Sequence, residues 1–113
     1  MTKSTASQAK VGVSTLIDER ADLLVSVSRA IHAHPELNYH EVFAHDLLTR
    51  TLHDRGLVVQ HSAYGVATAF EAVAGGSGPE VLVLLEYDAL PGIGHGCGHN
   101  VIAAAGLGAA ITL

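Results

Sequence analysis

The chain has 113 residues, 49% of them hydrophobic and 15% charged, which suits one small domain around one core. Its net charge is −5 and no Lys or Arg cluster occurs, so a nucleic-acid surface is excluded. The single cysteine, Cys97, excludes an internal disulfide and favours a reducing, cytoplasmic location. The polar N-terminus lacks a secretory signal, and the longest apolar run, Val101–Leu113, is shorter than the roughly 20 residues that span a bilayer.

The first half of the chain is predicted to be helical. Residues 1–12 are polar and are predicted to form a flexible leader. Apolar residues then recur at helical spacing, which predicts a helix from near Ser14 or Thr15 to Pro35. Proline disfavours helical backbone in the residue before it, so the helix is expected to end there. A second helix is predicted over residues 41–55, where apolar residues make one face.

Three strands and a final helix are predicted after Gly56, the glycine expected to follow the second helix. Two strands are predicted over residues 57–61 and 66–73, and the continuous apolar run Val81–Leu85 is typical of a strand buried on both faces. Residues 101–113 are predicted to form a buried helix whose glycines allow close approach to a sheet. The order α-α-β-β-β-α predicts an α/β fold, with a mixed sheet and helices packed on it.

Most of the residues that can carry chemistry lie in segment 86–100. The segment starts at the carboxyl end of the third predicted strand, where open α/β sheets bind their ligands, and runs through a glycine-rich loop. Cys97 and His99 are two residues apart, and both side chains are good ligands for zinc-like metals. Glu86 and Asp88 are also two apart, so on a strand their carboxylates share one face.

Spacing alone leaves other interpretations of this loop open. A glycine-rich loop with an incidental Cys and His accounts for the short Cys-x-His pair as well. A nucleophilic Cys97 paired with His95 or His99 is a second alternative, and a thiol-based or metal-storage role for these three residues is a third. A dinucleotide or phosphate loop is excluded, because its spacing requires glycine at Cys97 or His99 and no Lys follows. The remaining histidines are expected to be solvated or to cap backbone carbonyls; they are His32, His34, His40, His45, His53 and His61.

The run EYDALPGIGHGCGHN over residues 86–100 resembles the signature of the aminoacylase/carboxypeptidase family of metallohydrolases. It is similar to the amidohydrolase branch, which includes p-aminobenzoyl-glutamate, hippurate and auxin-conjugate hydrolases. The run HAHPEL over residues 32–37, followed by Glu41, resembles the entrance of the same branch. Two positions depart from the pattern, since Glu86 and Asn100 stand where many members have Asp.

The resemblance covers residues 13–113 and implies the N-terminal portion of a catalytic domain with a two-metal exopeptidase-like fold. It implies a metal-dependent amidohydrolase or peptidase that cleaves amide bonds of N-acyl amino acids or small peptides. Cys97 and His99 carry over as metal ligands, and Asp88 as the residue that orients a ligand or tunes the metal site. The complete site of the family holds two divalent metals, for which zinc or manganese is expected first, with cobalt or nickel as alternatives.

The rest of the family's site is expected to lie outside this chain. In the family, the signature is followed by the general-base Glu, a carboxylate ligand, two further His ligands and the lid domain. This sequence instead stops on the apolar residues 109–113. We therefore expect the chain alone to be inactive. The alternative is a non-catalytic fragment or a subunit completed by a second polypeptide, and an exposed sheet edge favours self-association. The expected partner is a small amide or peptide substrate, with neither nucleic acid nor membrane.

Overall fold

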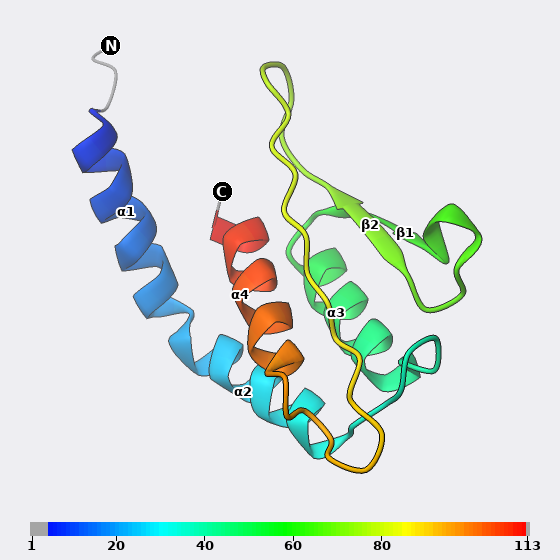
Figure 1. Cartoon of the computed structure of the whole chain (residues 1–113). Helices are drawn as coiled ribbons and strands as arrows, with labels where there is room; N and C mark the ends of the chain where they lie inside the picture. The colour runs from blue at the N-terminus through cyan, green and yellow to red at the C-terminus, as the bar shows by residue number, and fades with distance from the viewer. Residues whose placement is uncertain (1–4, 113) are drawn as a thin grey trace.

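A computed structural model describes residues 5–112 (Figure 1). Helices α2, α3 and α4 lie against one another, while α1 extends away from them and a small sheet lies beside α3. The elements in chain order are α1 Ala6–Glu19, α2 Ala21–Ala33, α3 Val42–Asp54, β1 Val58–His61, the short 3-10 helix η1 Ala63–Gly65, β2 Phe70–Val73 and α4 His99–Thr112.

The first predicted helix is in fact two helices, α1 and α2, joined at Arg20. The expected start near residue 14 is wrong, because α1 begins at Ala6; residues 6–12 of the expected leader are helical, and residues 1–4 lie outside the described residues. The reason is a capping box. The Thr5 hydroxyl accepts the Gln8 N–H at 3.1 Å, and the Gln8 side chain accepts the Thr5 N–H at 2.9 Å.

The core lies between α2, α3 and α4. Its largest fully buried side chains are Val27 and Ile31 from α2, Leu48 and Leu52 from α3, and Leu107 from α4. Burying an aliphatic side chain of this size stabilises the fold by about 1.5–3 kcal/mol. Helix α1 has no buried residue, so its support comes from its cap and from the contact of its last turns with α2 and α4.

Helix α3 confirms the prediction over residues 41–55, and Gly56 follows it with a φ of 86°. The sequence did not show what caps its N-terminus. The carboxylate of Glu36 accepts the N–H groups of Phe43 at 2.8 Å and Ala44 at 2.9 Å. A carboxylate at this end also opposes the positive end of the helix dipole. Glu36 of the HAHPEL run therefore has a structural role.

The sheet is smaller than predicted. Strand β1 pairs antiparallel with β2, from Val58 opposite Val73 to His61 opposite Phe70. The strand predicted over residues 57–61 is confirmed, whereas the one predicted over residues 66–73 is formed only in its second half. The structure therefore contains both helices and strands, as expected. Within residues 5–112, however, its sheet consists of two antiparallel strands, so the predicted combination of parallel and antiparallel pairing is not formed.

The prediction that Val81–Leu85 is a strand buried on both faces is wrong for this chain. The segment is extended but unpaired, and Leu82 and Leu84 are 81% and 77% exposed. A buried strand needs neighbours along both edges and layers on both faces. The described residues give it only a helix on one side, where α4 contacts Leu85.

The last predicted helix is confirmed as α4, which begins at His99. Its glycines do lie close to neighbouring residues, but not to a sheet: a Cβ added at Gly106 would lie 2.7 Å from the Cβ of Leu85 in the unpaired segment, and one added at Gly108 would lie 2.9 Å from the Cδ1 of Leu24 in α2. Among the helices described, none has both the length and the apolar character needed to cross a membrane.

Candidate metal centre

The ring of His99, the first residue of α4, lies between two carboxylates. Its Nδ1 atom is 2.9 Å from both the Oδ1 atom and the backbone oxygen of Asp88. Its Nε2 atom is 3.2 Å from Oε2 of Glu86. The His99 and Asp88 side chains are largely buried, whereas that of Glu86 is 62% exposed. The structure therefore brings together three of the residues singled out in segment 86–100.

The partners of Nδ1 determine which ring nitrogen carries a proton. Both oxygens of Asp88 that face it are acceptors, so Nδ1 must be the donor. A carboxylate that holds one nitrogen in this way is the usual support of a metal-binding histidine, since it directs the other nitrogen outward. Here the other nitrogen, Nε2, faces the Glu86 carboxylate.

The structure does not add Cys97 to this group. Its side chain is exposed in the loop before α4, and its role as a ligand stays a prediction. Although Glu86, Asp88 and His99 lie together, within residues 5–112 no three His, Cys, Asp or Glu side chains are arranged so that they could hold a metal ion. Imidazole, carboxylate and thiolate are donors that suit zinc-like metals. The donor types therefore fit a metal, but too few of them come together among residues 5–112 to hold one alone.

The burial of His95 was not predicted from the sequence. It is 8% exposed, its ring centroid lies 6.3 Å from that of His32, and neither ring nitrogen has a hydrogen-bond partner within the described residues. Burial, and then the nearby His32 and His99, lower the pKa of His95, while Asp88 and the backbone of Ile31 oppose this only in part. A buried imidazole with a lowered pKa thus lies beside the His99 group. Only its place in the glycine-rich loop hinted at this.

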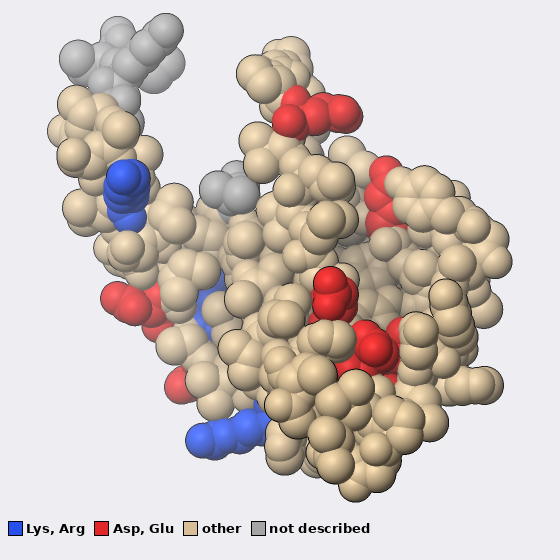
Figure 2. All heavy atoms as spheres, in the orientation of Figure 1, with Lys and Arg blue, Asp and Glu red and all other residues tan. Residues whose placement is uncertain are grey.

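A cleft of about 220 Å³ borders Glu86 and Asp88. Its wall also includes Tyr39, Glu41 and Thr68. Glu41 is 8% exposed, and its carboxylate accepts a hydrogen bond from the Thr68 hydroxyl at 3.3 Å. Figure 2 shows Asp and Glu side chains in a hollow of the face it draws. Asp88, the partner of His99, thus borders a cleft that is also lined by the carboxylates of Glu41 and Glu86.

No protein-family model matches the sequence, but curated proteins do. The chain is 43% identical over 107 residues to the Xaa-Arg dipeptidase of Mus musculus, a match that covers 86% of this chain and 25% of the relative. It is 42% identical over 115 residues to the Homo sapiens protein of that name, covering 90% and 26%. It is 31% identical over 104 residues to a subunit of the p-aminobenzoyl-glutamate hydrolase of Escherichia coli, covering 77% and 22%. The chain spans about a quarter of the length of these relatives.

Proposed function

Because this chain is homologous to part of the aminoacylase/amidohydrolase family of hydrolases, we propose that it forms part of a metal-dependent amide hydrolase. In this proposal His99 and Cys97 are metal ligands, and Asp88 positions His99. The observation that carries it is the contact of His99 Nδ1 with Asp88, which leaves Nε2 directed toward Glu86.

The reaction proposed is hydrolysis of an amide bond in a dipeptide or an N-acyl amino acid. A bound divalent metal, zinc or manganese first, supplies Lewis acidity and an activated water. The chain's own residues do the positioning: Asp88 keeps His99 in one tautomer and orientation, and the cleft beside them admits the substrate. The mouse and human relatives are named for dipeptides ending in Arg, so such a dipeptide is the first substrate to test. A cytoplasmic location belongs to the same proposal.

Residues 5–112 form no group of three metal ligands. In this proposal the remaining ligands and the general base therefore come from outside these residues. The same observation favours the second candidate, a non-catalytic fragment. A chimera separates the two: this chain replaces the aligned quarter of the mouse relative, so that the missing parts are supplied in one polypeptide.

For the first candidate, we expect the chimera to hydrolyse an Xaa-Arg dipeptide and His99→Ala to abolish both bound metal and turnover. His53→Ala is the matched control, because His53 is on α3 with its side chain 79% exposed. Bound metal is measured by elemental analysis. A folded chimera that binds metal equally well with and without His99 contradicts the proposal.

A further inference from the structure

Glu41 is a nearly buried carboxylate without a cationic partner. It is 8% exposed, and within the described part of the chain no Lys, Arg or His side chain forms an ion pair with it. Its Oε1 atom accepts a hydrogen bond from the Thr68 hydroxyl at 3.3 Å, and its Oε2 atom accepts none among residues 5–112. A buried charge is costly unless a counter-charge and hydrogen bonds satisfy it. The carboxylate therefore points to a cation that binds beside it.

The cleft of about 220 Å³ that Glu41 lines carries negative charge. Glu86 and Asp88 line it too, and among residues 5–112 no Lys, Arg or His does. Those two carboxylates both face His99, whereas Glu41 has no imidazole paired with it in the same part of the chain. Figure 2 shows the Lys and Arg atoms of this face apart from the hollow that holds the carboxylates. The cleft therefore favours a cationic ligand, with Glu41 as the carboxylate that receives it.

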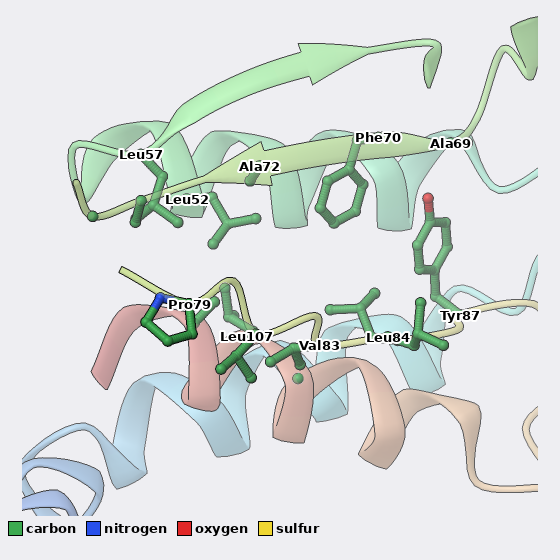
Figure 3. A pocket seen from close by; sticks show the side chains of 16 residues that line it. Leu52, Leu57, Ala69, Phe70, Ala72, Pro79, Val83, Leu84, Tyr87 and Leu107 are labelled. Carbon is green, nitrogen blue, oxygen red and sulfur yellow. The ribbon is translucent and has the colours of Figure 1, made fainter. Parts of the chain in front are cut away.

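The cleft adjoins a larger apolar groove of about 530 Å³ between β2 and Val81–Leu85. Tyr87 lines both, and Figure 3 shows its hydroxyl end directed toward Ala69. That hydroxyl donates to the backbone oxygen of Thr68, which uses its one proton. Within the described residues no charged side chain lines the groove. A charged group of a ligand therefore belongs in the cleft.

The size and lining of the cleft favour an organic cation, and a guanidinium in particular. No three side chains among residues 5–112 are arranged to hold a metal ion. Tyr39, which is 67% exposed, lines the same cleft. A guanidinium binds a carboxylate through two parallel N–H donors and stacks on an aromatic face, which a Lys ammonium does less well. Pockets for whole small molecules take roughly 300–1,000 Å³, so this cleft suits a single side chain.

We propose that the cleft binds the guanidinium group of an amide substrate, with Glu41 as its carboxylate partner and Tyr39 as the aromatic side chain on which it stacks. The inference rests on the proposed function and deepens it, because the cleft borders Asp88, which contacts His99. Glu41 and Tyr39 are then specificity-determining residues. An Arg side chain from the rest of a family-length protein offers the same chemistry, and the experiment separates the two sources.

The first arm uses the metal-free 113-residue chain and two probes of nearly equal shape. N-acetyl-argininamide carries the guanidinium, and N-acetyl-citrullinamide replaces it with a neutral urea. Nuclear magnetic resonance of the isotope-labelled chain follows the amides of Tyr39, Glu41 and Thr68 during titration. We expect saturable shifts with the arginine probe and binding of the citrulline probe that is at least tenfold weaker, because a hydrogen bond to a charged group is lost.

Variants of the chain assign the binding to the cleft. Glu41→Gln should weaken binding of the arginine probe at least tenfold, because the charge is lost while an amide oxygen can still accept from Thr68. Tyr39→Leu should weaken it about threefold, and Tyr39→Phe should restore it. Glu80→Gln is the control, because it removes the same charge from an exposed position outside the cleft. Circular dichroism checks the fold of each variant, and the comparison of the two probes needs no variant.

The second arm is calorimetry on the metal-free chimera. If the substrate supplies the guanidinium, the chimera still binds the arginine probe, and Glu41→Gln weakens that binding at least tenfold. A chimera in which Glu41→Gln has no effect, because another part of the protein occupies the cleft, overturns the proposal. Equal binding of the two probes, or no saturable shift at the cleft, also overturns it. Neither arm needs turnover, so a chimera that binds the probe without hydrolysing a substrate counts against the proposed function and supports the cation site.

Discussion

The Nδ1 atom of His99 lies 2.9 Å from the Oδ1 atom of Asp88, and this contact joins the start of α4 to the end of the extended segment before it. The two residues are eleven apart in the sequence, with the glycine-rich loop between them. The carboxylate–imidazole pair therefore joins the two ends of the loop, and the orientation of His99 depends on Asp88.

Asp88→Asn in the chimera should lower zinc affinity about 10- to 100-fold, the usual cost of losing the carboxylate behind a metal-binding histidine. Competition with a chelating dye measures this. Asp46→Asn is the control, because Asp46 is 63% exposed and contacts His45 away from the site. Equal affinities for the two variants would show that Asp88 does not support a ligand.

Glu36→Ala should lower the free energy of unfolding of the isolated chain by about 1–2 kcal/mol, because two N–H groups at the start of α3 lose their acceptor. Urea denaturation followed by circular dichroism measures the change. Glu19→Ala removes an exposed carboxylate near the end of α1 and should change stability by less than half as much. If both variants lose the same stability, the cap contributes nothing.

Gly106→Ala should destabilise the chain by about 1–3 kcal/mol, since the new methyl group meets the Cβ of Leu85 at 2.7 Å. At Gly108 the nearest atom is the Cδ1 of Leu24 at 2.9 Å, the end of a flexible side chain. The higher helix propensity of Ala, about 1 kcal/mol, should then leave Gly108→Ala near neutral. Thermal unfolding of the pair distinguishes them, and a harmless Gly106→Ala would contradict the packing described.

Burial, with a smaller contribution from the Glu41 carboxylate, raises the pKa of Tyr87 to about 12 from its ordinary value of 10.0. Below pH 10 both folded and unfolded chains keep this proton. Above it the unfolded chain loses the proton first, so the free energy of unfolding should fall as pH rises, by on the order of 2 kcal/mol near pH 12.

Tyr87→Phe should remove much of this fall and cost about 1 kcal/mol at neutral pH through the lost hydrogen bond to Thr68. The control is Tyr64→Phe. A hydrogen bond to Glu71 raises the pKa of Tyr64, but the side chain is exposed, so its removal should leave the Tyr87 effect in place. Urea denaturation from about pH 8 to about pH 11 compares the variants. A wild-type slope retained in Tyr87→Phe would refute the assignment.

The helices were predictable where periodicity was strong and their ends were marked. Helices α3 and α4 lie close to their predicted bounds, and Gly56 follows α3 as expected. The start of α1 was missed because its first residues are largely polar and were taken for a flexible leader, whereas Thr5 and Gln8 form a capping box there. The strand at Val81–Leu85 failed for a different reason: its apolar pattern is that of a buried strand, and the described residues include none of the neighbours it needs.

The candidate site was predictable only in part. Residue types and spacing pointed to Asp88 and His99, and the structure brings them into contact. The contact of Glu86 with Nε2, the burial of His95 and the capping role of Glu36 depend on how the loop, α2 and α3 pack together. No spacing rule contains that information. The ligand role of Cys97 stays a prediction.

The most direct test of the central claim is the rate of Xaa-Arg dipeptide hydrolysis by the chimera before chelation, after chelation and after metal is returned. We expect turnover that a chelator abolishes and that zinc or manganese restores, with none from the 113-residue chain alone. A folded, metal-loaded chimera without turnover, or turnover that survives complete metal removal, would contradict the account.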